Sequence, residues 1–365
     1  MTGDTLVTPA LLRMNGGRPA QGAPLRAARW EPDREDQDLT HAQQQDDYRE
    51  DVLGPGYEVR TLPLRPDDEG EVVATLIRST VPGGSRRAVL YVHGFVDYFF
   101  QTHLADAWHD AGFDFYAVDL RKYGRSLREH QTPNYITSLE DYDEELDEAA
   151  RIIREDEGHD VLVVMGHSTG GLATSLWAHR RRGRGIVDAL VLNSPWFDLN
   201  ASLFQRTVGT AAVHRIGTLR PRTVVGRLGT SYGHYLHRET GGEWDYSLTW
   251  KPHGGFPVVA AWLAGVRRGH AELSRGLAID CPVLVACSDA TSNPAKEPAR
   301  VSSTDVVLDV AHIARRAPGL GRLVTVVRIA GGIHDLTLSP EPARSTFFTE
   351  LARWQEAYVP ASLDR

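Results

Sequence analysis

One short stretch, Val161–Leu172, constrains the fold of this chain more than any other. It reads Val-Leu-Val-Val-Met-Gly-His-Ser-Thr-Gly-Gly-Leu, which predicts a buried strand, a tight Gly-x-Ser-x-Gly turn and the start of a helix. So sharp a turn lifts the hydroxyl of Ser168 above the sheet and leaves it open to a substrate. Gly166 and Gly170 suit the turn because a larger residue would collide with neighbouring backbone.

The same stretch predicts chemistry at Ser168. A helix that begins just after this serine directs its free N–H groups and its positive end toward the point where negative charge would develop. The backbone N–H of Thr169 would then form half of an oxyanion hole. The bare pattern also occurs by chance in loops, but here an apolar strand precedes it and apolar residues at helical spacing follow it. We therefore interpret Ser168 as a nucleophile.

Strands and helices alternate along most of the chain. Strands are expected at 57–64, 72–79, 88–92, 113–119, 161–165, 189–192, 282–286 and 323–329. A helix over 138–157 is capped by Ser138 and Asp141, and a closing helix has Ser339 as its expected N-cap. This alternation predicts an α/β fold, a mostly parallel central sheet flanked by helices. Reactive groups of such sheets gather at the carboxyl ends of the strands, which is where the sequence places His93, Ser168, Asp289, Asp305 and His334.

The alternation stops between two of the expected core strands. Residues 196–278 are rich in Gly, Arg, Thr and aromatic residues, so we predict an inserted cap there. The core is then built from 53–195 and 279–365. Residues 1–52 are polar and show no core-forming period, which predicts a surface arm or a partly disordered leader.

The aromatic residues of the cap admit two interpretations. They would line a pocket for an apolar acyl chain or a bulky ring system, or they would build the core of the cap itself. The first interpretation predicts substrate-binding roles for Trp196, Tyr232, Tyr235 and Trp250.

Composition and charge exclude several classes of function. The net charge of −8 does not favour a nucleic-acid partner, and we see neither a membrane-spanning run nor a signal peptide. Cys281 and Cys287 lie along one expected strand, too far apart for a disulfide with each other, which favours a cytoplasmic location. The sequence has no metal cluster, phosphate loop or dinucleotide fingerprint, so no metal or cofactor is expected.

Four motifs together resemble the α/β-hydrolase superfamily: His93-Gly94, Asp119 followed by Gly124-Arg125-Ser126, Gly166-His-Ser-Thr-Gly170, and Gly331-Gly-Ile-His334. The chain looks most like the monoacylglycerol lipase and lysophospholipase group, which includes serine aminopeptidase-like members. The resemblance covers about residues 57–358. It implies that Ser168 is the nucleophile, that His334 is the general base, and that the N–H groups of Phe95 and Thr169 form the oxyanion hole. His93 and His167 would fix the oxyanion loop and the serine turn.

The chain departs from the pattern of this group in two of the motifs. Phe95-Val96-Asp97 stands where small residues usually follow His-Gly, and Lys122-Tyr123 stands where a glycine element usually precedes Gly124. The first departure would reshape the floor of the pocket.

The carboxylate that would orient His334 has more than one candidate, because the loop after Cys287 is longer than in the group. Asp289 lies just past Cys287, where a strand-end acid is expected, but 334 − 289 = 45 residues before the histidine. Asp305 lies 334 − 305 = 29 residues before it, close to the usual gap, and is followed by a short turn and a helical run as in the group. We favour Asp305, with Asp289 and, less so, Asp309 as alternatives.

These residues predict a lipase- or esterase-like serine hydrolase that needs no cofactor. Ser168 would attack a small-molecule carboxylic ester with an apolar or bulky acyl part, and His334, oriented by Asp305, would carry the proton. The same triad could instead cleave a lactone, an amide or a carbon–carbon bond, or transfer or cyclise an acyl group in secondary metabolism. A binding protein on a hydrolase scaffold is the third hypothesis, and it is disfavoured because binding needs no such triad.

Overall fold

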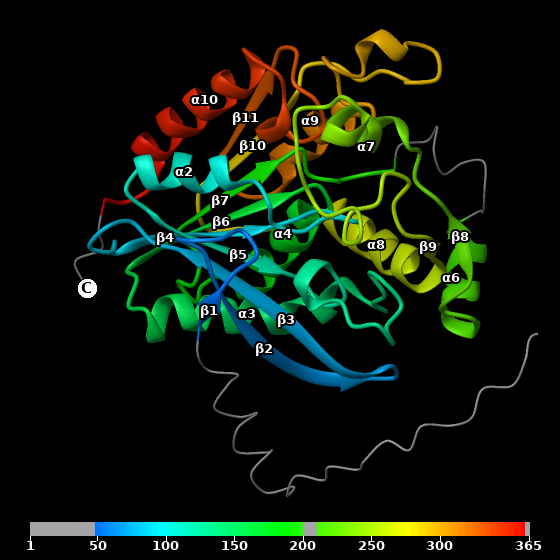
Figure 1. Ribbon diagram of the computed structural model, residues 1–365, viewed down its shortest axis with the longest axis horizontal. Coiled ribbons are helices and arrows are strands. Elements are labelled where there is room, and N and C mark those ends of the chain that lie inside the picture. The colour runs from blue at the N-terminus through cyan, green and yellow to red at the C-terminus, as the bar shows by residue number, and fades with distance from the viewer. Residues whose placement is uncertain (1–47, 200–209, 362–365) are drawn as a thin grey trace, which may run out of the picture. The chain divides into compact units, whose positions relative to one another are not determined.

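The computed structural model describes residues 48–199 and 210–361. A nine-stranded sheet runs through this part of the chain in the order β1-β2-β3-β5-β4-β6-β7-β10-β11 (Figure 1). Its strands are β1 (Arg49–Glu50), β2 (Glu58–Asp67), β3 (Gly70–Ser79), β4 (Arg87–Val92), β5 (Asp114–Asp119), β6 (Val161–His167), β7 (Ala189–Asn193), β10 (Val283–Ser288) and β11 (Val324–Ile329).

The expected mostly parallel sheet is confirmed. All neighbours from β5 across to β11 pair in parallel, and only β1, β2 and β3 pair antiparallel at one edge. Every residue of β6 and β7 is buried, because helices cover both faces of the central strands. That double cover is why these strands are continuous apolar runs rather than alternating ones.

The helices form a layer on each face of the sheet (Figure 1). One face carries α2 (Thr102–Asp110) and α10 (Ala343–Tyr358), which pack Trp108 and Phe347 into one apolar cluster. The other carries α3 (Asp143–Arg151), α4 (Thr169–Arg181), α8 (Ala260–Leu273) and α9 (Val310–Arg316), which contribute to a second cluster.

Two helix ends test the capping predictions. The capping box of Ser138 and Asp141 is confirmed, on a short 3₁₀ turn that leads into α3 and then into one π-helical turn over Ile152–Asp156. The prediction for the closing helix is wrong, because α10 begins at Ala343 with Pro342 in the N-cap position. The hydroxyl of Ser339 is engaged elsewhere: it accepts the N–H of Ile333 and donates to the carbonyl of Asp335.

The segment 196–278, which the sequence predicts to be a cap and which we refer to as the cap, has its own small elements. They are α6 (Thr210–Leu219), β8 (Val224–Gly226), α7 (Ser231–Leu236), β9 (Val258–Val259) and α8, with β8 and β9 forming a two-stranded antiparallel sheet. The predicted polar arm, 1–52, lies outside the described residues except for 48–52, within which β1 pairs with β2.

Two further expectations concern the cysteines and membrane-spanning helices. Cys281 and Cys287 are both buried and unpaired, as their spacing indicated. Among the described residues, no helix is long and apolar enough to cross a membrane.

Candidate active site

Ser168 occupies the predicted turn between β6 and α4. Its backbone has φ 52° and ψ −115°, a left-handed conformation that a non-glycine residue adopts only under strong local constraint. The turn is tight because a Cβ on Gly166 would lie 2.5 Å from the Thr174 hydroxyl, and one on Gly170 would overlap the His93 carbonyl. The turn therefore requires glycine at both positions, two residues before and two residues after the serine.

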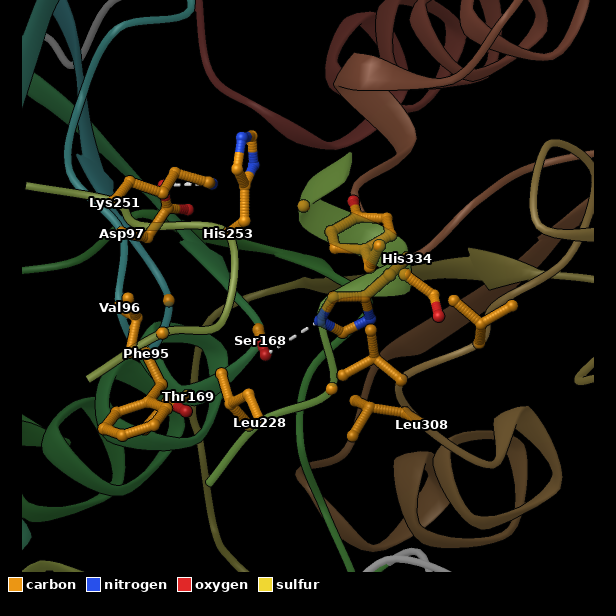
Figure 2. Close-up of a pocket in the computed structure, with 18 of the residues that line it drawn as sticks. Phe95, Val96, Asp97, Ser168, Thr169, Leu228, Lys251, His253, Leu308 and His334 are labelled. Carbon is orange, nitrogen blue, oxygen red and sulfur yellow. Dashed lines mark hydrogen bonds and ion pairs between the residues drawn. The ribbon is translucent and has the colours of Figure 1, made fainter. Parts of the chain in front are cut away.

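The structure brings Ser168, His334 and Asp305 into one hydrogen-bonded line. The Oγ of Ser168 lies 3.0 Å from Nε2 of His334 (Figure 2), and Nδ1 of the same ring lies 2.9 Å from Oδ2 of Asp305. All three side chains are buried, Asp305 completely. The geometry is that of a nucleophile, a base and a group that orients the base.

Asp305 is itself fixed by the backbone around it. Its Oδ1 accepts the N–H groups of Val307 at 2.8 Å and of Leu308 at 2.7 Å, which leaves Oδ2 directed at the imidazole. The alternative Asp289 is exposed, and among the described residues its side chain accepts one bond, from the Gly331 N–H at 3.4 Å. Asp309 caps α9 by accepting the N–H of Ala311. Of the three candidate acids, only Asp305 contacts His334.

Phe95 and Thr169 lie on the side of Ser168 opposite His334 (Figure 2). Phe95 belongs to the loop after β4, and Thr169 is the first residue of α4. Neither amide has a hydrogen-bond acceptor among the residues that the structure describes. Free amides at a helix start beside a nucleophile are the donors that an oxyanion hole needs.

Two buried histidines hold the loops that carry these groups. His93 donates from Nδ1 to the Gly94 carbonyl at 2.8 Å and accepts the Leu120 N–H at Nε2 at 3.0 Å. His167 bonds through Nδ1 to the carbonyl of Asn193 at 3.1 Å. Burial lowers the pKa of both rings, so both stay neutral near pH 7 and hold these loops through their hydrogen bonds.

A buried polar cluster adjoins the site, and the sequence motifs did not reveal it. Asp97, His167 and Asp335 offer ligand atoms that all lie within 4.8 Å of one another. Both carboxylates have partners within the protein. Lys251 forms an ion pair with Asp97, and Thr337 donates to Asp335 through both its N–H and its hydroxyl. Burial alone would raise the pKa of Asp335, but His167 and these hydrogen bonds hold it below its usual range.

Ser168 opens into a cavity of about 320 Å³ between the core and the cap. Apolar side chains form much of its wall, among them Phe95, Leu228, Val258, Trp262, Val306 and Leu308. Asp97, Lys251 and His253 lie toward the other end (Figure 2). The cavity thus has an apolar part and a charged part on two sides of the serine.

The four aromatic residues predicted to bind substrate divide between two places. Trp196 and Tyr232 line the cavity. Tyr235 and Trp250 instead pack in an aromatic cluster between cap and core, where the ring of Trp250 lies 5.1 Å from that of Tyr98. Tyr232 also accepts the N–H of Asp335 at its hydroxyl, at 3.0 Å. Two of the four aromatic residues therefore face the cavity, and their role in binding substrate stays a prediction.

Solved structures with the same architecture identify the fold. A monoglyceride lipase variant from Saccharomyces cerevisiae, with a substrate analogue, superposes with a TM-score of 0.60 at 14% identity over 82% of this chain and 96% of that one. A monoacylglycerol lipase from Paleococcus ferrophilus gives 0.56 at 19% identity over 77% and 98%. The chain has the α/β-hydrolase fold. The resemblance inferred from the four motifs is thereby confirmed.

Two further comparisons bear on this chain. Est1E from Butyrivibrio proteoclasticus, with bound ferulic acid, gives a TM-score of 0.51 at 14% identity over 81% of this chain and 98% of that one. A family model described as serine aminopeptidase, S33, matches residues 83–241, which include the serine turn and part of the cap. No curated protein is similar enough in sequence to count as a relative.

Proposed function

We propose that this α/β-hydrolase cleaves carboxylic esters through a covalent acyl-enzyme, with Ser168, His334 and Asp305 as its triad. One observation carries the proposal: the continuous hydrogen-bonded line from Ser168 through His334 to the buried carboxylate of Asp305. A binding protein has no use for a strained serine aimed at an oriented imidazole beside two free amides.

The reaction follows from the positions of these groups. Nε2 of His334 takes the proton of the Ser168 hydroxyl as the oxygen adds to the ester carbonyl. The carbonyl oxygen becomes negative and accepts the N–H groups of Phe95 and Thr169. The imidazolium, held by Asp305, gives its proton to the leaving alcohol as the carbon–oxygen bond breaks. Water, activated by the same imidazole, then releases the acid and restores the serine.

The cavity supports an ester of modest size with an apolar or aromatic acyl part. Its volume of about 320 Å³ is near the lower end of the roughly 300–1,000 Å³ that ligand pockets occupy. Leu228, Leu308 and Trp262 offer apolar contact, and the similar structures include proteins named as lipases and one that holds ferulic acid. The cytoplasmic location stays a prediction.

The test is covalent labelling followed by turnover. A fluorophosphonate probe should label the wild-type protein and fail to label Ser168→Ala, and mass spectrometry should place the adduct on the peptide that contains residue 168. Turnover of p-nitrophenyl esters should fall by about 10⁶-fold in the same variant. Parallel panels of lactones, amides and acyl acceptors separate ester hydrolysis from the alternative uses of the triad. A wild-type protein that the probe does not label would refute the proposal.

A further inference from the structure

We propose that Lys251 of the cap is a positioning residue for the oxyanion hole, and that it acts through the buried carboxylate of Asp97. The inference rests on the proposed hydrolase function and extends it, because it gives the cap a part in the rate of the reaction as well as in substrate binding. The structural basis is a strained loop, a buried ion pair and a set of contacts between that loop and one segment of the cap.

The loop that carries the Phe95 amide is held in an unfavourable conformation. Val96, the next residue, has φ 51°, which places a β-branched side chain in the left-handed region where such residues are outliers. Backbone strain of this kind persists only when the surrounding structure enforces it. Something outside the loop must therefore hold it in place.

The cap segment around Lys251 supplies the contacts that do so. Nζ of Lys251 lies 2.5 Å from Oδ1 of Asp97 (Figure 2). The N–H of Ser247 donates to the hydroxyl of Tyr98 at 2.7 Å, and the Tyr98 ring packs edge-on against Trp250. Two consecutive loop residues are thus fastened to one short stretch of the cap.

Electrostatics make the ion pair the decisive contact. The Asp97 side chain is 3% exposed, and its Oδ2 has no hydrogen-bond partner among the described residues. A second buried carboxylate, that of Asp335, belongs to the same cluster. Within the described part of the chain, Lys251 is the cationic side chain that contacts Asp97. Without it, two like charges would face each other in a dry site, which is strongly unfavourable.

The consequence for catalysis follows from the short covalent path between Asp97 and Phe95. If Lys251 is removed, the Asp97 carboxylate must turn toward water or draw in another donor, and the strained Val96 backbone relaxes with it. The Phe95 amide is two residues away and would leave the position that the oxyanion requires. A shift of about 1 Å in such a group is enough to cost about 10²-fold in rate.

The first experiment compares Lys251→Met with a matched control, Arg222→Met. Arg222 also joins the cap to the core by ion pairs, to Asp68 at 2.7 Å and Glu69 at 3.0 Å, but on the β2–β3 turn rather than on the oxyanion loop. We expect kcat for the preferred p-nitrophenyl ester to fall about 10²-fold in Lys251→Met, with KM changed by less than about threefold. Arg222→Met should stay within about twofold of wild type, and Lys251→Arg should recover at least about tenfold over the methionine variant.

The second experiment tests whether the effect passes through Asp97. In an Asp97→Asn background the charge that Lys251 pairs with is gone, so Lys251→Met should cost less than about threefold more. The labelling rate with a fluorophosphonate should follow kcat across the set, because the phosphoryl oxygen occupies the same hole. Melting temperatures identify any variant that has lost its fold. If Lys251→Met alone does not fold, the comparison is made between Asp97→Asn and the double variant Asp97→Asn/Lys251→Met.

Several results would overturn the inference. They are a loss confined to KM, an equal loss in Arg222→Met, no recovery with arginine, or an undiminished effect of Lys251→Met in the Asp97→Asn background. An active wild type with an equally active Lys251→Met would remove this inference alone. A wild type that neither reacts with the probe nor cleaves esters would remove the proposed function as well, so the two failures are distinguishable.

Discussion

Replacing Asp305 by asparagine tests the assignment of the triad acid most directly. In the wild type, Oδ1 accepts two backbone N–H groups and Oδ2 accepts Nδ1–H of His334. An asparagine keeps its carbonyl oxygen where the two N–H groups of Val307 and Leu308 point, because its amide nitrogen cannot accept them. The NH₂ group then faces Nδ1 of His334 and forces the ring to carry its proton on Nε2, from which it cannot accept the proton of Ser168.

The expected loss can be given a magnitude. A wrong tautomer in a triad of intact geometry costs about 10⁴-fold in turnover, which corresponds to about 5.4 kcal/mol at about 1.36 kcal/mol for each factor of ten. The fold should survive, since the two backbone hydrogen bonds are kept. The assay is kcat for a p-nitrophenyl ester at pH 8, with the melting temperature of each variant measured alongside.

The two other candidate acids provide matched controls for this substitution. Asp289→Asn changes an exposed side chain that makes one 3.4 Å contact, and Asp309→Asn keeps a helix cap, because asparagine caps as well as aspartate. Both should stay within about twofold of wild type. If Asp289→Asn loses as much activity as Asp305→Asn, or if Asp305→Asn stays active, the tautomer argument is wrong.

Two further predictions concern stability. Burial lowers the pKa of His270 to about 4, below the unfolded value of about 6.5, so the unfolded chain takes up the proton first as the pH falls. Between pH 7 and pH 5 the free energy of unfolding should therefore drop by about 2 kcal/mol more in wild type than in His270→Gln. Urea titrations that give the two proteins the same pH dependence of this free energy would contradict the prediction. Gly170→Ala sets a Cβ against the carbonyl of His93 and should lower the free energy of unfolding by about 1–3 kcal/mol. At Gly319 the nearest atom to an added Cβ is in Gly276, 3.9 Å away, so the control Gly319→Ala should change this free energy by less than about 1 kcal/mol.

The features of the core that the sequence predicts are those fixed by short-range rules. The run Val161–Met165 is apolar throughout because β6 is buried on both faces, and the glycines beside Ser168 are required by steric contacts within the turn itself. The capping box at Ser138 is also local. The closing helix was misplaced because Ser339 looks like a cap in sequence, while in the fold its hydroxyl serves the loop of His334 instead.

The contacts that join cap and core could not be predicted in the same way. Asp97 and Lys251 are 154 residues apart, and Tyr232 is 103 residues from the Asp335 amide that it accepts. No periodicity links such pairs, and strands as short as β8 and β9, of 3 and 2 residues, leave no pattern. One signal was present: Phe95-Val96-Asp97 departs from the small residues that usually follow His-Gly, and the structure relates that departure to the cap.

The cap contacts both loops on which the proposed chemistry depends. Trp262 of α8 stacks on Phe95 with ring centroids 3.9 Å apart, and Lys251 pairs with Asp97 in the same loop. Tyr232 of α7 accepts the amide next to His334 and sets its ring 5.8 Å from the imidazole. A displacement of the cap would therefore move an oxyanion donor and the base together, because each is fastened to it by a separate buried contact. The core supplies every group of the proposed triad and oxyanion hole, but the relative placement of donor, nucleophile and base is set jointly by core and cap.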